Sequence, residues 1–312
     1  MPLFEFEMSL HTFFLINQIS VSIYLFFMVI SSIGNIIIVV VTVRSKSLQN
    51  PCNILIGIQA FTDFLMQGST VFYAYSAYNE LLVTVTTCFW ANFLTLAAFD
   101  FSIMMMFFIA LDRYICVHYL SFYKRMNPHL YISGVVSTCL AYATILKILS
   151  YLSLTNELTI CIIAESMSGF MANLWFGAGA LVNTEINTAN NPDYNTINRS
   201  LRTLIYVYIF GWFFTTVMGS IILVISPNHR VFVALVSIIG IAANMNVAAP
   251  IFVYYFQSTL YKTEIRNLFG FKKITNCLAH FSRDNVADFD DYSLCAFPNQ
   301  RSISMESGDS GQ

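Results

Sequence analysis

Seven apolar stretches, each long enough to cross a lipid bilayer, divide this chain. The hydrocarbon core of a bilayer is about 30 Å thick and takes about 20 residues of helix to cross. Backbone groups in lipid must be hydrogen-bonded within their own segment, so the stretches should be helices; a β-barrel would show shorter, alternating segments. The stretches are 20–43, 53–77, 88–111, 130–152, 158–182, 203–225 and 231–256.

The composition agrees with an all-α membrane protein. Hydrophobic residues make up 57% of the 312 residues and charged residues only 10%, whereas a soluble domain carries about 25% charged residues. The basic residues are dispersed, so nucleic acid is not an expected partner. No nucleophile-base set or metal-ligand spacing stands out, so we expect neither an enzyme nor a metal site. A transporter would show an internal repeat and paired broken helices, and the sequence shows neither.

The positions of the Lys and Arg residues predict the orientation of the chain. Cytoplasmic loops of membrane proteins carry an excess of these residues. With the N-terminus outside, 13 of the 15 basic residues fall on the inner side, and Lys147 and Arg230 remain on the outer side. The opposite orientation would place 13 outside, so we expect an extracellular N-terminus.

The segments around the spans complete four predicted regions. Residues 1–19 lack the basic start of a cleavable signal peptide and should form the extracellular N-terminus. Residues 20–256 form the seven-helix domain. Residues 257–281 are basic and carry apolar residues at helical spacing, typical of a short amphipathic helix on the membrane surface. Residues 282–312 are rich in Ser, Asp and Asn and predict a disordered cytoplasmic tail.

The triplet Asp112-Arg113-Tyr114 stands at the predicted inner end of the third span, with Cys88 at its outer end. Two opposite charges there could be a solvated helix end. A carboxylate beside a guanidinium in a low-dielectric site can also act as a two-state switch, because breaking their bond needs a compensating partner. The triplet and the cysteine resemble those of rhodopsin-like receptors. The resemblance implies that Asp112 holds Arg113 at rest and that the freed arginine meets a heterotrimeric G-protein.

Asp63 lies in the middle of the second span, where a carboxylate is costly and therefore a functional candidate. Asn35 in the first span is its expected polar neighbour. The cluster could be a structural hydrogen-bonded group. Its counterpart in rhodopsin-like receptors binds Na⁺, so the resemblance implies a sodium site near Asp63; we expect no other cofactor.

Cys88 and Cys161 are the two cysteines placed on the outer side, near helix mouths. Because the extracellular compartment is oxidising, we predict a disulfide that ties the second outer loop to the third span.

The candidate residues for a ligand pocket come from the third and sixth spans. Asp100 is buried near the middle of the third span, and Trp212 and Phe213 form an aromatic floor in the sixth. Thr95 stands where similar amine receptors carry an Asp, so a biogenic amine is disfavoured. The seventh span has no Lys, so a retinal Schiff base is disfavoured as well.

Further stretches resemble nematode serpentine chemoreceptors of the Srsx class, roughly over residues 20–270. The resemblance implies a small-molecule receptor of the plasma membrane with a chemosensory, olfactory role, and makes a sensory cilium a candidate location. The stretches are Gly34-Asn35, 53–63, 111–114 with Tyr123 and 127–131, 199–201 leading to Gly211-Trp212, and 252–255 before Ser258.

Two departures from the rhodopsin-like pattern bear on signalling. Tyr254 stands for the inner tyrosine of the seventh span, but the asparagine of the usual Asn-Pro-x-x-Tyr motif is missing, and Asn246 is the candidate substitute. The fifth stretch turns polar after residue 182. Either this span starts early, near Leu158, or its inner half is polar and frayed. The alternative function is therefore a signalling-incompetent remnant that acts as a membrane partner or trafficking protein.

Overall fold

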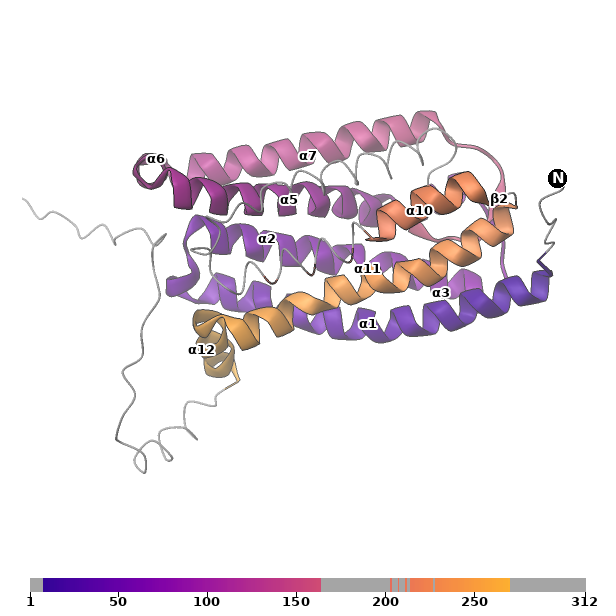
Figure 1. Ribbon diagram of the computed structural model, residues 1–312, viewed down its shortest axis with the longest axis horizontal. Coiled ribbons are helices and arrows are strands. Elements are labelled where there is room, and N and C mark those ends of the chain that lie inside the picture. Colours follow the sequence, from indigo (N-terminus) through magenta and orange to yellow (C-terminus); the bar gives the residue numbers. More distant parts are fainter. Residues whose placement is uncertain are drawn as a thin grey trace, which may run out of the picture.

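The computed structural model describes residues 8–163, 203, 207, 211, 214–226 and 228–269. They form a bundle of long helices lying side by side (Figure 1). The elements are α1 (Leu10–Arg44), the 3₁₀-helix η1 (Lys46–Leu48), α2 (Pro51–Met66), α3 (Gly68–Tyr78), β1 (Val83–Thr84), α4 (Val85–Ala91), α5 (Phe93–His118), α6 (Leu120–Arg125), α7 (Pro128–Leu152), β2 (Leu158–Thr159), α10 (Phe214–Ile225), α11 (His229–Gln257) and α12 (Thr259–Leu268).

Four helices among the described residues are long and apolar enough to cross a membrane: α1, α5, α7 and α11. Their outer faces carry large hydrophobic side chains such as Phe26, Ile33 and Leu140, each more than half exposed. Lipid would cover such surfaces. The predicted all-α membrane class is thus confirmed. Most of the fifth expected span, the aromatic pair Trp212-Phe213 and the 282–312 tail lie outside the described residues.

Polar caps fix where the helices begin. The Asn50 side chain accepts a hydrogen bond from the backbone N–H of Asn53, and Asn127 caps α7 in the same way. A proline follows each cap, at a position where a helix needs no backbone donor. Ser9 caps α1, which therefore begins at Leu10 rather than near Ser20. The expected boundary at residue 20 was wrong because the sequence before it is equally compatible with a helix.

Two of the expected spans are broken near their outer ends. The second ends as α2 at Met66 and restarts as α3 at Gly68. A Cβ at Gly68 would lie 3.0 Å from the Thr95 side chain, so α3 approaches α5 closely there. The third span divides at Asn92 into α4 and α5. At its other end α5 continues to His118, so Asp112 lies within the helix, not at its end.

The outer loop between α7 and the fifth span is extended. Strand β2 pairs antiparallel with β1, with Val83 opposite Thr159. The predicted disulfide joins Cys88 to Cys161, with their Cα atoms 5.3 Å apart. Leu158 therefore lies in a strand, and the expectation that a helix starts near it was wrong. The strand pairing and the disulfide hold this segment near the outer end of the third span.

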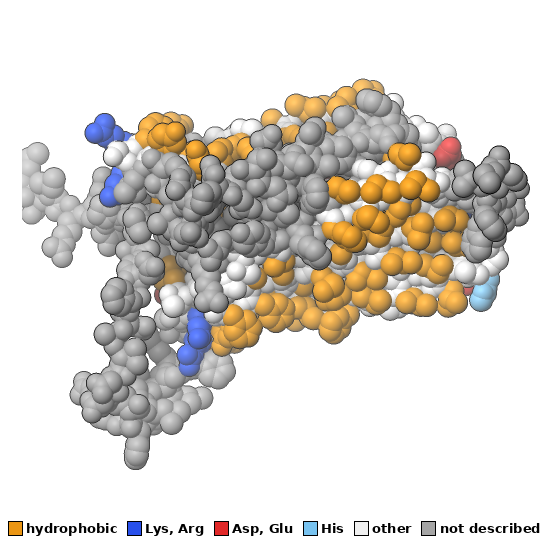
Figure 2. All heavy atoms as spheres, in the orientation of Figure 1, with side chains coloured by type: hydrophobic (Ala, Val, Ile, Leu, Met, Phe, Trp, Pro, Cys, Tyr) orange, Lys and Arg blue, Asp and Glu red, His pale blue; other side chains and the backbone are white. Residues whose placement is uncertain are grey.

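The two ends of the bundle differ in charge. The Lys and Arg side chains visible in Figure 2 gather at the end where α6 and α12 lie, opposite the end that carries β2 and the disulfide. Helix α12 leaves the bundle at this basic end (Figure 1). It buries Tyr261 and Ile265, and the Tyr261 ring packs on Tyr254 with 4.7 Å between ring centroids. This is the amphipathic helix that the sequence predicted.

The disulfide should contribute measurably to stability because it closes a separation of 73 residues. Replacing Cys88 with Ser should cost about 2 to 4 kcal/mol of unfolding free energy. The Cys88→Ser/Cys161→Ser double variant should cost no more than either single variant, since all three break the same bond. Thermal unfolding of the purified protein measures this. If the losses of unfolding free energy in the two single variants added up in the double variant, the two cysteines would not share a bond. Cys139→Ser, at a buried free cysteine, is the control for the loss of a thiol.

Candidate functional site

An ion pair between neighbouring residues stands at the basic end of α5. The Arg113 guanidinium donates to Asp112 Oδ2 from Nε at 3.0 Å and from Nη2 at 2.7 Å. The Asp112 side chain is fully buried, whereas that of Arg113 is 17% exposed. Two charged hydrogen bonds to one carboxylate in a low-dielectric site are strong. The arginine is therefore held by the neighbouring residue of its own helix.

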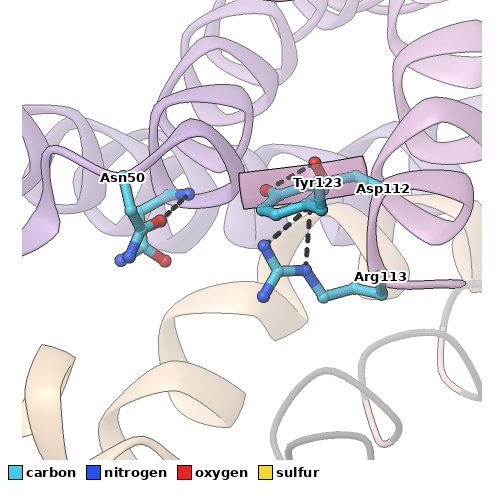
Figure 3. Close-up of polar contacts among 5 residues, drawn as sticks. Asn50, Asp112, Arg113 and Tyr123 are labelled. Carbon is cyan, nitrogen blue, oxygen red and sulfur yellow. Dashed lines mark hydrogen bonds and ion pairs between the residues drawn. The ribbon is translucent and has the colours of Figure 1, made fainter. Parts of the chain in front are cut away.

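Tyr123 of α6 completes this site by donating a hydrogen bond of 2.9 Å to Asp112 Oδ1. Figure 3 shows Tyr123 and the Arg113 guanidinium both joined to the Asp112 carboxylate by hydrogen bonds. Burial and the Asp112 carboxylate raise the pKa of Tyr123, so the phenol keeps its proton and remains a donor. Tyr114, the third member of the triplet, is 36% exposed and its ring packs against Tyr119 instead. We call Asp112, Arg113 and Tyr123 the inner lock.

A second polar cluster surrounds Asp63 in the middle of the bundle. Asp63 Oδ1 accepts hydrogen bonds from Ser102 Oγ at 2.6 Å and from Gln59 Nε2 at 3.0 Å. A small cavity of about 30 Å³ adjoins it, and Asn35, Asn246 and Tyr254 also line the cavity. The structure thus brings together the sequence-predicted residues of this cluster. It adds Gln59 and Ser102, and the helical i, i+4 spacing of Gln59 and Asp63 is a signal that could have revealed the first.

The chemistry of this inner cavity fits a small polar occupant. Its volume of about 30 Å³ exceeds the roughly 10 to 15 Å³ that one water molecule needs. Gln59 Oε1 and Asn35 Nδ2 are buried without a hydrogen-bond partner among the described residues. The carboxylate of Asp63 and the Gln59 oxygen suit a hard cation such as Na⁺, and the Asn35 donor suits a water bound to it.

A buried ion pair that the sequence analysis missed joins α5 to α7. Lys147 Nζ lies 2.9 Å from Asp100 Oδ2, and both side chains are at least 96% buried. Lys147 was expected on the outer side of the membrane; instead it points into the bundle. Asp100, a candidate for ligand contact, is thus paired with Lys147, and its contact with a ligand stays a prediction. A signal was present: one acid and one base in neighbouring apolar spans stabilise each other.

An outer cavity of about 110 Å³ opens between the helices near the disulfide end. Its described lining does not include Thr95, whose hydroxyl donates to the Asn92 carbonyl at 2.8 Å. Trp212 and Phe213 lie outside the described residues. The walls come from α1 to α3, α5, α10, α11 and the segment after Cys161. The lining is Tyr24, Met66, Gln67, Ser69, Thr70, Tyr73, Phe99, Ile162, Ile163, Thr215, Gly219, Val236, Ile239, Gly240, Ala243, Asn244 and Val247.

A helical membrane bundle with an outer cavity, a disulfide across its mouth and a restrained arginine at its basic end has the architecture of a serpentine receptor. The comparison with known families agrees: residues 28–269 match the family described as serpentine type 7TM GPCR chemoreceptor Srsx. The chain belongs to this family of G-protein-coupled receptors, as its sequence motifs predicted.

A more distant likeness supports the same receptor class. A stretch of 64 residues is 39% identical to Opsin Rh3 of Drosophila pseudoobscura pseudoobscura. It covers 20% of this chain and 17% of the opsin, so the chain spans about a sixth of that relative's length.

The Asp100–Lys147 pair generates a stability prediction. Lys147→Met should leave a buried, unpaired carboxylate and cost about 3 to 5 kcal/mol of unfolding free energy. The Asp100→Leu/Lys147→Met double variant should recover most of that loss, because it removes both buried charges. Thermal unfolding of the purified protein gives the comparison. A double variant as unstable as Lys147→Met would show that the charges do not act as a pair. Lys124→Met, in the last turn of α6 at the basic end, is the control for loss of a lysine.

Proposed function

We propose that this chain is a chemosensory receptor that binds a small molecule in the outer cavity and activates a heterotrimeric G-protein through Arg113. The single observation that carries the proposal is the inner lock. Its arginine is bound by Asp112, and Asp112 is bound in turn by Tyr123 of a separate helix. An element held by two hydrogen-bonded contacts can exist in a closed and an open arrangement, and a ligand that favours one of them shifts the population.

Helix α11 supplies a physical connection between the two ends. Val247 lines both the outer cavity and the inner cavity next to Asp63. Tyr254, which also lines the inner cavity, packs on Tyr261 of α12 at the basic end. A displacement of α11 by a molecule in the outer cavity would therefore reach the Asp63 cluster directly. In this proposal Na⁺ with a bound water occupies the inner cavity at rest, held by Asp63 and Gln59, and leaves when the helices move.

The same proposal places the protein in the plasma membrane, and in a sensory neuron at the membrane of the cilium. The disulfide end faces the exterior, where oxidation is favoured, and the basic end faces the cytosol. The G-protein then meets the end at which Arg113 is held. A retinal chromophore as in opsins is not part of the proposal, because α11 contains no lysine for a Schiff base.

Loosening the inner lock should raise basal signalling. Tyr123→Phe removes a hydrogen bond to a charged group, which is worth about 1.5 kcal/mol or more, so the open fraction should rise roughly tenfold while it is small. Adding Arg113→Ala should abolish the gain. Nucleotide exchange on G-proteins in cells that express the receptor is the readout. Tyr119→Phe, the same change at an exposed neighbour, is the matched control.

The outcome also separates a receptor from a signalling-incompetent remnant. A remnant would reach the membrane normally yet give no nucleotide exchange with any of these variants across the G-protein classes. Exchange that persists after Arg113→Ala would instead contradict the role of the arginine.

Sidedness has its own test. An epitope fused before Met1 should be labelled by antibody on intact cells, whereas an epitope after Gln312 should need permeabilisation. The reason is that the basic end is retained in the cytosol during insertion. The opposite labelling pattern would overturn the orientation. Labelling of both epitopes only after permeabilisation would overturn the plasma-membrane location.

A further inference from the structure

We infer that the outer cavity selects small neutral molecules that are mostly apolar and carry one hydrogen-bonding group, and that Gln67 recognises that group. This inference rests on the proposed function, because it names the class of ligand for the same cavity. Three observations carry it: the lining of the cavity, the hydrogen bonds its polar residues already make, and the position of Gln67.

The first observation is the absence of charge in the described lining. None of the described residues around the cavity is Asp, Glu, Lys, Arg or His. The two charges buried in the same half of the bundle, Asp100 and Lys147, bind each other at 2.9 Å. An ionised ligand would lose its hydration and find no counter-charge among these residues, which is costly. Neutral ligands avoid that cost.

The second observation is that most polar groups of the wall are already used. The Tyr24 hydroxyl donates to the Ser237 carbonyl at 2.7 Å, and the Tyr73 hydroxyl donates to Asn17 Oδ1 at 2.8 Å. The Thr215 hydroxyl donates to the Gly211 carbonyl, and the Asn244 amide donates to the Gly240 carbonyl. These groups already donate to other protein atoms, so they are not available to donate a hydrogen bond to a ligand.

Gln67 differs from these residues. It is 3% exposed, lines the cavity, and its Oε1 has no hydrogen-bond partner among the described residues. It sits in the break between α2 and α3, where its side chain is placed by a turn and not by a continuous helix. A buried amide without a partner is destabilising unless a ligand satisfies it. The unpartnered Oε1 can accept a hydrogen bond from a hydroxyl group of the ligand.

The size of the cavity limits the rest of the ligand. Its 110 Å³ is of the same order as an engineered apolar cavity of about 150 Å³ that binds benzene. A ring or short chain of about six carbons with one hydroxyl group therefore matches both the volume and the polarity.

The experiment measures binding alone, without a G-protein, so it can fail or succeed independently of signalling. The purified full-length receptor is heated with toluene, benzyl alcohol, benzylamine or benzoate at neutral pH, and the shift in unfolding temperature gives relative affinities. These probes share a ring and differ in one substituent. Benzyl alcohol should bind roughly 3- to 10-fold more tightly than toluene, the range of one net hydrogen bond. The two ions should bind more weakly than either.

Variants assign the effect to Gln67. Gln67→Leu should abolish the preference for benzyl alcohol over toluene and should raise the unfolding temperature without ligand, because it removes a buried unsatisfied amide. Gln67→Glu should favour the benzylammonium ion. Gln257→Leu, the same change at the last residue of α11, where another glutamine oxygen is buried without a partner among the described residues, should leave the preference intact. Ala243→Phe should fill the cavity and reduce binding of every probe. Any temperature shift that remains in this variant comes from the effect of the probe on the surrounding lipid or detergent and is subtracted.

Several results would overturn the inference. One is tighter binding of benzoate or benzylammonium than of benzyl alcohol to the unaltered receptor. Another is a preference for benzyl alcohol that survives Gln67→Leu. A third is a shift in unfolding temperature with benzyl alcohol that is the same in the unaltered receptor and in Ala243→Phe. Binding as expected in a receptor that never activates a G-protein would leave this inference standing and would overturn the proposed signalling role instead.

Discussion

A buried charge in a lipid-embedded bundle needs a partner, and three carboxylates, one on α2 and two on α5, are under that constraint. Each is satisfied differently. Asp100 pairs with Lys147 on a neighbouring helix, Asp112 pairs with Arg113 beside it, and Asp63 of α2 binds Ser102 of α5 through a neutral hydroxyl. Because the cost of leaving any of these groups unpaired is several kcal/mol, the contacts fix how α2, α5 and α7 sit against one another.

The kind of partner distinguishes a structural contact from a switch. Asp100 and Lys147 are both shielded from water, so separating them would leave two buried charges with no substitute. Arg113 is partly exposed at the basic end, where water or another protein can take the place of Asp112. The inner lock can therefore open at modest cost, whereas the Asp100–Lys147 pair keeps the centre of the bundle closed. A receptor needs both properties, a rigid frame and a part that moves.

Much of the fold followed from local patterns. The apolar stretches predicted where helices run, since backbone in lipid has few alternatives, and the Asn-Pro pairs predicted where α2 and α7 begin. The breaks at Gln67 and Asn92 were missed, because hydropathy averages over about 20 residues and does not register one turn of altered geometry. The outer strand pair was missed for a related reason: two residues per strand are too few for a periodic signal.

The candidate site likewise divides into contacts that the sequence predicted and contacts that it did not. Neighbours in sequence, such as Asp112 and Arg113, were visible as a pair because the chain itself brings them together. The disulfide was predicted because few cysteines lie on the outer side. Tyr123 beside Asp112, Lys147 beside Asp100 and the unsatisfied Gln67 in the cavity wall depend on how separate helices rotate and pack. The sequence by itself determined a membrane-crossing helical receptor and its charged motif, because solvation by lipid acts on each segment separately. The tertiary structure alone decided which polar groups meet and which remains unpaired, because that depends on distances between segments that no local pattern encodes.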